Sequence, residues 1–184
     1  MLRFNYSWIY DKQIHWWKKS KYDEDSYKKV NNYIKRLEKE WKELDKKVFD
    51  VISKVSGLKW KNKNIECYVV SDLVYPFSSP LTITIHTNIS HQIEIIIHEL
   101  IHNIWIQNED GVKFKDYRKY GKLNFNVKIH ILVHAIEKEV LLRLFIEKRT
   151  KKYIKWYDKF PDYKKAWDIV EREGSKNIIK EWIK

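Results

Sequence analysis

The stretch that decides how this chain is interpreted is residues 90–107, SHQIEIIIHELIHNIWIQ. It contains seven isoleucines and, among them, the run His98-Glu99-Leu100-Ile101-His102. Ser90 is a good N-cap for a helix, and the polar run Asn108-Glu109-Asp110-Gly111 is a stop signal. The pattern therefore predicts an apolar helix from Ser90 to about Gln107 that carries two histidines and a glutamate on one central turn.

The spacing of these three polar residues favours a metal site. Residues four apart on a helix lie about 40° apart around its axis, so His98 and His102 can reach one ion from the same side. Glu99 lies about 100° further round, where it suits a base acting on water beside the ion. Because a carboxylate and two imidazoles are costly to bury without a partner, we expect a zinc ion with His98 and His102 as ligands and Glu99 as catalytic base.

A catalytic zinc usually has three protein ligands, and the third is expected on a second helix. The sequence IHILVHAIEKEVL, residues 129–141, places His130, His134 and Glu137 on one face, whereas Glu139 points to the opposite side. Glu137 is the favoured third ligand, His134 is the next candidate, and His130 or a loop residue also stays open. If Glu137 binds the metal, His134 is expected to orient a ligand or to stabilise a developing oxyanion.

The segment before the motif carries the strand signals. Ile65 to Val70 reads as a short strand, and residues 74–80 read as a loop. Leu81 to Thr87 alternates apolar and polar residues with many β-branched side chains, which predicts a half-buried strand at the edge of a sheet.

The flanking segments are predicted to be helical. Apolar residues spaced by three and four from Tyr27 to Val55 predict one long helix, which we expect to pack on its own domain rather than in a coiled-coil dimer. The second ligand-bearing helix is expected to begin at Asn124 or Asn126. Two short helices, Tyr163 to Arg172 and Ser175 to the end, are expected to close the chain.

Together these elements predict an α+β fold that is mostly α, in a single domain of residues 1–184. Residues 1–56 form an aromatic segment and a long helix, residues 57–160 form the core that carries the predicted site, and residues 161–184 form a helical tail. A monomer is the favoured oligomeric state.

The strand, the HExxH helix and the second ligand-bearing helix resemble the catalytic core of the zincin metallopeptidases over Ile65 to Phe145. Trp105 and Asn108 stand where metzincins have a glycine and a third histidine, so the chain is not of that branch. Its compact size and the HExxH-then-HAIE pattern are most similar to the gluzincin branch and to the small archaeal minigluzincins.

The resemblance implies a zinc-dependent peptidase that acts on a peptide or protein substrate. Glu99 would take a proton from the zinc-bound water, and Tyr117, Tyr120 or His134 would stabilise the oxyanion. The strand Leu81 to Thr87 would pair with extended substrate. Tryptophans near both termini (Trp8, Trp16, Trp17, Trp167 and Trp182) raise the further hypothesis that the enzyme is latent.

The charge composition of the chain suggests an alternative to the peptidase function. The chain has 37 Lys and Arg against 25 Asp and Glu, a formal net charge of +12, but the excess is mostly lysine and is spread along the chain. The rival hypothesis is a basic, helix-rich protein-binding or nucleic-acid-binding module with a structural zinc closed by four ligands, and nucleic acid is the less favoured partner.

Further expectations concern compartment and membranes. One cysteine, Cys67, excludes an intramolecular disulfide. The first twenty residues are aromatic and interrupted by charges, without the apolar core of a secretory signal. The most apolar stretch, Ile129 to Ile146, contains charged residues such as Arg143. We therefore expect a cytoplasmic protein with no membrane partner.

Overall fold

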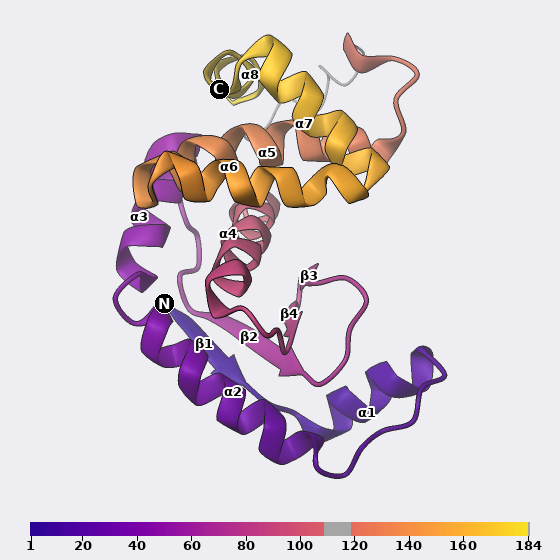
Figure 1. Cartoon of the computed structure of the whole chain (residues 1–184). Coiled ribbons are helices and arrows are strands. Elements are labelled where there is room, and N and C mark those ends of the chain that lie inside the picture. The colour runs from indigo at the N-terminus through magenta and orange to yellow at the C-terminus, as the bar shows by residue number, and fades with distance from the viewer. Residues whose placement is uncertain (109–118, 184) are drawn as a thin grey trace. The chain divides into compact units, whose positions relative to one another are not determined.

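The computed structural model describes residues 1–108 and 119–183, which form a mostly helical α+β fold, as predicted (Figure 1). In chain order the elements are β1 (Leu2–Asn5), α1 (Trp8–Trp17), α2 (Ser26–Trp41), α3 (Asp45–Ser56), β2 (Ile65–Val70), β3 (Phe77–Ser78), β4 (Leu81–Thr84), α4 (Ile89–Ile106), α5 (Phe125–Leu144), α6 (Glu147–Trp156), the 3-10 turn η3 (Tyr157–Lys159), α7 (Pro161–Glu173) and α8 (Ser175–Trp182).

The chain divides into two compact units. The first comprises Met1–Lys47 and Asn62–Asn103, and it contains the sheet and the histidine motif. The second comprises Val48–Lys61 and Ile104–Lys184, and it contains α5 to α8. The boundaries fall inside α3 and α4, so each of these helices contributes residues to both units.

The sheet of the first unit has the strand order β1-β2-β4-β3, with β1, β2 and β4 parallel and β3 antiparallel to β4. The predicted strand Ile65–Val70 is confirmed as β2. The predicted strand Leu81–Thr87 forms, but it ends at Thr84 and lies inside the sheet rather than at its edge. The prediction of an edge was wrong because Phe77 and Ser78, assigned to a loop, fold back and pair with Thr82 and Leu81.

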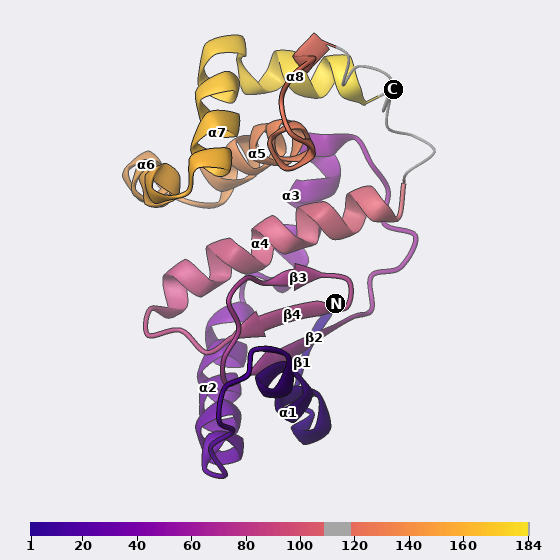
Figure 2. The same ribbon diagram turned by 90° about the vertical axis from the view of Figure 1, so that its right-hand side faces the viewer.

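Helices cover both faces of this sheet. Tyr10 of α1 packs edge-on against Tyr68 of β2 and its hydroxyl contacts the Thr82 hydroxyl, 3.0 Å away. Trp41 of α2 packs edge-on against Phe4, whose partner in register is Cys67. Because neighbours along a strand point to opposite faces, α1 covers one face and α2 the other. Figure 2 shows α1 in front of the sheet and α2 behind it.

The stretch Tyr27 to Val55 is helical as predicted, but it forms two helices instead of one. The break occurs between Trp41 and Asp45, where the Leu44 amide bonds to the Trp41 carbonyl oxygen at 2.8 Å. The buried Asp45 carboxylate accepts hydrogen bonds from the Trp41 indole (2.9 Å) and from the amide of Leu2 in β1 (3.1 Å). Contact with a distant strand therefore decides a break that helical spacing alone cannot show.

The second unit is built around α5. Most of this helix is buried on all sides, as expected for a helix at the centre of a bundle. α7 and α8 pack against it, and their buried residues include Ala166, Trp167, Val170, Ile178 and Trp182. The two predicted C-terminal helices are thus confirmed. Among the described residues, no helix has the length and apolarity needed to cross a membrane.

Candidate metal centre

α4 presents the histidine motif on a deeply buried helix. Its N-terminus is capped by Asn88 rather than by the predicted Ser90, since the Asn88 side-chain oxygen accepts from the His91 amide at 3.1 Å. Ile96, Ile97 and the other apolar residues of its central turns have almost no exposed surface. The motif therefore lies on a helix whose position is fixed by core packing, and α4 runs beside β3 and β4 in both views (Figures 1 and 2).

The two histidines of the motif face each other. The Nε2 atoms of His98 and His102 are 3.2 Å apart, and the side chain of His98 is buried. Two nitrogen ligands of one tetrahedral zinc, each about 2.0–2.1 Å from the ion, lie about 3.3–3.4 Å apart. The observed separation fits two ligands of a single ion.

The carboxylate of Glu99 is held by the edge strand. Ser78 Oγ donates a hydrogen bond of 2.6 Å to Glu99 Oε2. The Asn103 side chain, one turn further along α4, donates to the carbonyl oxygen of Ser78 at 3.0 Å. These two contacts connect β3 to α4 within the motif and directly after it, and they restrict the rotation of the Glu99 side chain.

Cys67 lies near this carboxylate, but it remains a thiol. It is fully buried in β2, and burial raises its pKa well above the ordinary value. The negative charge of Glu99 raises the pKa further. A thiol in this state is neither a nucleophile nor a metal ligand at neutral pH.

α5 begins as predicted and positions His130. Asn124 is its N-cap, and its side-chain oxygen accepts from the Val127 amide at 2.9 Å. His130 Nδ1 lies 2.8 Å from the carbonyl oxygen of Asn126, which can only accept, so Nδ1 carries the proton. In the neutral ring Nε2 then presents its lone pair, as a metal-binding histidine requires.

Glu137 lies at the end of a chain of buried hydroxyl groups. The Tyr153 hydroxyl donates to Glu137 Oε1 at 2.9 Å, and the Tyr157 hydroxyl lies 2.6 Å from that of Tyr153. Burial raises the pKa of Tyr153 strongly, and the nearby charge of Glu137 raises it further. Tyr153 is therefore a permanent donor, which orients one oxygen of a carboxylate that has no exposed surface.

His134 is enclosed by aromatic rings. Its imidazole stacks on the Trp167 indole with ring centroids 4.3 Å apart and an interplanar angle of 13°. Tyr157, Tyr163 and His130 also contact the ring, and none of its surface is exposed. The predicted oxyanion role of His134 stays a prediction, and full burial gives a substrate no direct surface on this ring.

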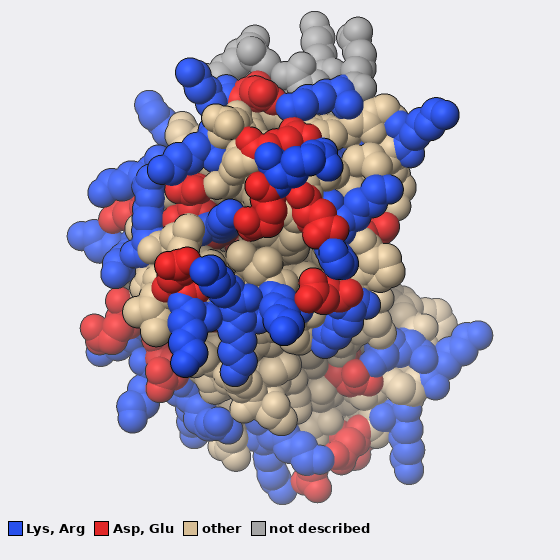
Figure 3. All heavy atoms as spheres, turned by 45° about the horizontal axis from the view of Figure 1, so that its top comes forward, with Lys and Arg blue, Asp and Glu red and all other residues tan. Residues whose placement is uncertain are grey.

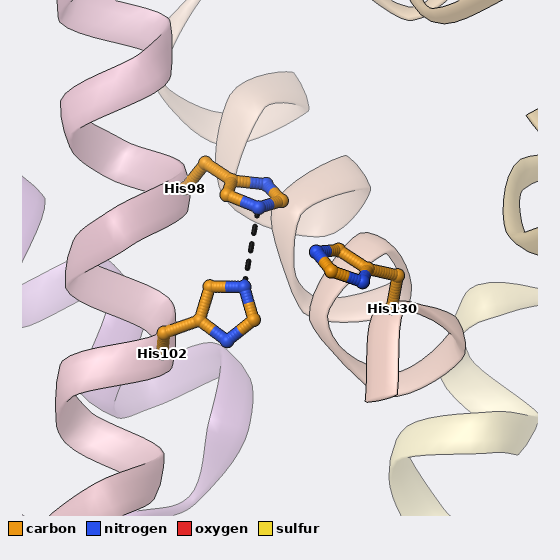
Figure 4. Close-up of side chains that lie close together, drawn as sticks. All are labelled: His98, His102 and His130. Atoms are coloured by element: carbon orange, nitrogen blue, oxygen red, sulfur yellow. Dashed lines mark hydrogen bonds between the residues drawn. The ribbon is translucent and has the colours of Figure 1, made fainter. Parts of the chain in front are cut away.

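Among the described residues, two groups of three side chains offer ligand atoms that all lie within 4.8 Å of one another and could hold a metal ion. One consists of His98, His102 and His130, shown in Figure 4. The other consists of His98, His134 and Glu137. His98 belongs to both groups, whereas the predicted ligands His102 and Glu137 belong to different ones.

Other residues named from the sequence have different surroundings. Glu139 points away from His130, as predicted, and accepts from the Ser175 hydroxyl at 2.7 Å. The Tyr120 hydroxyl donates to Glu173 at 2.8 Å, and Tyr117 lies outside the described residues. Of the five terminal tryptophans, Trp167 and Trp182 are buried in the second unit, while Trp8, Trp16 and Trp17 are exposed.

Sequence reasoning missed Ser78, Asn103 and the tyrosine pair Tyr153 and Tyr157. The sequence does carry a signal for the tyrosines, since they are four residues apart, with Tyr153 near the end of α6 and Tyr157 directly after it. The role of Ser78 could not be predicted from the sequence, because its contact with Glu99 spans 21 residues and depends on how β3 pairs with β4.

Basic side chains do not gather into one patch on the face shown in Figure 3, where acidic side chains lie among them. No protein-family model, curated protein or solved structure matches the chain.

Proposed function

We propose that this protein is a zinc-dependent metallopeptidase in which His98 and His102 bind the metal and Glu99 is the general base. The observation that carries the proposal is the arrangement on α4. Two imidazole nitrogens stand 3.2 Å apart, and the adjacent carboxylate is held by a hydroxyl of the neighbouring strand. Zinc in such a set acts as a Lewis acid that lowers the pKa of a coordinated water and polarises a carbonyl group.

The proposed chemistry of the chain itself is proton transfer. Glu99 accepts a proton through one carboxylate oxygen and later delivers it to the leaving amine. Ser78 donates to Oε2, and this hydrogen bond restricts the orientation of the carboxylate that accepts the proton. Anchoring one oxygen keeps the other in a constant position, which lowers the entropic cost of reaching the transition state.

For the third ligand we propose His130, with Glu137 as the alternative. His130 shares a ligand-distance group with both histidines of the motif, and the hydrogen bond from its Nδ1 to the Asn126 carbonyl oxygen fixes the tautomer whose Nε2 carries a lone pair. Glu137 is supported by the resemblance to gluzincins and by the Tyr153 hydroxyl, which orients its carboxylate. In the His130 arrangement, Glu137 and His134 support the ligand-bearing helix instead of binding the ion.

We propose an extended peptide as substrate. β3 is a short outer strand of the sheet, and Ser78 in this strand contacts the proposed base. A peptide that pairs with an outer strand is held by main-chain hydrogen bonds, which need no particular side chains. Such binding would bring a scissile bond close to Glu99.

The rival function is a binding module whose zinc is structural. A structural zinc is closed by four protein ligands and leaves no position for water. The anchored Glu99 favours the catalytic site, because a closed site has no use for a base beside the metal. The dispersed charges of Figure 3 offer no support for a nucleic-acid surface on that face.

The first test is the zinc content of purified protein prepared without a histidine tag or chelator. We expect about one zinc per wild-type chain and almost none in His98→Ala. His130→Ala and Glu137→Gln distinguish the two candidates for the third ligand, since only the loss of a true ligand should greatly weaken zinc binding. His86→Ala is the control, because His86 belongs to neither ligand group and should leave zinc unchanged.

Each outcome has one meaning. Loss of zinc in His130→Ala with retention in Glu137→Gln supports the three-histidine site, and the reverse result supports the gluzincin set. Loss in both variants, together with no peptidase activity, supports the closed structural site. A wild-type chain that stays free of zinc after incubation with it would refute the proposal.

The base is tested separately with Glu99→Gln. This variant should retain zinc, because Glu99 is not a ligand, and should lose at least about 100-fold in the rate of cleavage of a peptide mixture followed by mass spectrometry. Equal cleavage by the wild type and the variant would exclude Glu99 as the base.

A further inference from the structure

α1 exposes all three of its tryptophans. Its buried side consists of Ile14 and of two polar residues, Asp11 and His15, whereas Trp8, Trp16 and Trp17 lie on its solvent side. With about 100° per residue, half of the helix circumference is formed by Trp8, Lys12, Trp16, Ile9, Gln13 and Trp17. An apolar outer face of this kind is unusual on a surface helix of a water-exposed protein.

The exposed side chains are large. Ile9 and Trp16 are each 72% exposed, Trp17 is 57% exposed and Trp8 is 49% exposed. Exposure of one such residue is ordinary, but four lie on one half of a ten-residue helix, with Lys12 and Gln13 between them.

The polar side of α1 fixes this orientation. Asp11 Oδ1 accepts hydrogen bonds from the amide of Ser71 (2.9 Å) and from its hydroxyl (3.0 Å), at the end of β2. His15 Nε2 contacts the same hydroxyl at 2.9 Å, and the Ser20 hydroxyl lies 2.9 Å from His15 Nδ1. Rotating the helix to bury its tryptophans would break this network, so the aromatic face is held outward.

Lysines surround the aromatic face. Among residues 1–22 there are five basic residues, and Asp11, which is buried, is the one acid. The exposed acids that follow each have a lysine partner: Asp23 pairs with Lys29, Glu24 with Lys12 and Asp25 with Lys28. Lys19 and Lys21, directly after the helix, are therefore an excess of positive charge beside the apolar face.

We infer that α1 binds the surface of a bilayer that contains anionic phospholipids, with Trp8, Ile9, Trp16 and Trp17 inserted at the level of the headgroups. Tryptophan favours the membrane–water interface because its ring is apolar and its N–H remains solvated, and adjacent lysines attract anionic headgroups. This mode of binding needs no membrane-spanning segment. It is independent of the zinc site, and it differs from the expectation that no membrane takes part.

Charge favours a lipid surface over a second copy of the chain as the occupant. In a symmetric dimer formed through α1, the same surface of each copy would face the other. Lys19 and Lys21 of one copy would then lie close to Lys19 and Lys21 of the other. Like charges at such a contact oppose association, whereas an anionic bilayer is complementary to them.

The test is co-flotation of the full chain with vesicles of phosphatidylcholine containing one third phosphatidylglycerol, at low salt. We expect the wild type to bind, and Ile9→Ser and Trp16→Ser each to lower the apparent affinity about tenfold. Ile146→Ser is the matched control, because Ile146 is 73% exposed and lies outside α1, and it should bind like the wild type. The unfolding temperature of each variant checks that the fold is retained.

A second arm tests the charge. Lys19→Glu with Lys21→Glu should weaken binding to the anionic vesicles, and vesicles of pure phosphatidylcholine should bind the wild type less well. Raising the salt concentration should reduce the difference between the two vesicle types.

Three results would overturn the inference. The first is a folded wild type that does not float with anionic vesicles. The second is equal binding by the α1 variants and Ile146→Ser. The third is a dimer, seen by sedimentation velocity, that Ile9→Ser dissociates, in which case the aromatic face joins two copies of the chain.

Discussion

Glu99, the proposed base, accepts a hydrogen bond from a hydroxyl group of the neighbouring strand. Ser78 Oγ donates to Oε2 at 2.6 Å, and the Asn103 side chain fixes the Ser78 backbone at 3.0 Å. Removing the hydroxyl leaves the carboxylate in place but gives it more rotational freedom. In the proposed mechanism Ser78 is thus a positioning residue, which would act on the chemistry through Glu99.

Ser78→Ala should lower kcat about 10- to 100-fold and leave KM nearly unchanged, because substrate pairing uses the strand backbone. Zinc content should stay at the wild-type value. Ser78→Thr, which keeps the hydroxyl, should restore most of the activity, and Ser79→Ala is the neighbouring control. If Ser78→Ala changed KM alone, the serine would act in substrate binding and not in orienting the base.

At the scale of elements, the break between α2 and α3 is the point where a helix and a distant strand depend on each other. The buried Asp45 carboxylate accepts from the Trp41 indole and from the backbone amide of Leu2. One aspartate thus ends a turn, begins α3 and connects β1 to the helices of the first unit.

Asp45→Ala should destabilise the protein by about 2–4 kcal/mol, because it leaves two buried donors without an acceptor. Asp45→Asn keeps one acceptor oxygen and should cost less. Urea unfolding followed by tryptophan fluorescence measures both, and Asp50→Ala in the same helix is the control. A loss below about 0.5 kcal/mol in Asp45→Ala would show that the two donors find other partners.

At the scale of the whole molecule, most ion pairs are exposed and contribute little, but the group around Glu173 is different. Burial raises the pKa of this carboxyl, yet hydrogen bonds from Lys119, Arg172 and Tyr120 outweigh burial and lower it below 4.5. The same network joins α7 to Lys119 and, through Glu181, to α8. It therefore contributes to the pH dependence of the second unit.

A carboxyl whose pKa is lowered in the folded state stabilises the protein above its unfolded pKa. That contribution is lost as the pH falls from about 4.5 through the folded value. Glu173→Gln should accordingly be destabilised most at neutral pH, and the difference from the wild type should shrink below about pH 4. Urea midpoints measured across this range test the prediction. Glu147→Gln, in an exposed pair with Lys151, should change stability little at any pH.

Much of the fold followed from local spacing. The spacing of apolar residues predicts which side of a helix or strand is buried. It was sufficient to predict α4, α5, β2 and the two C-terminal helices. The same reasoning selected His98, Glu99 and His102 as the candidate site, since the proposed chemistry depends on positions within about one helical turn. It also grouped His130, His134 and Glu137 on one face of α5, although it could not choose among them.

What only the tertiary structure decided are contacts between residues far apart in sequence. β1 and β3 are too short to show a period and exist through pairing with β2 and β4. The break at Asp45 depends on Leu2, and the orientation of Glu99 depends on Ser78. The outward orientation of the α1 tryptophans likewise depends on Ser71. The spacing of apolar residues predicts which residues are buried. It does not predict which distant residue a buried polar group will bond to, because that partner is brought close only when the whole chain folds. These features could therefore not be predicted from the neighbouring sequence.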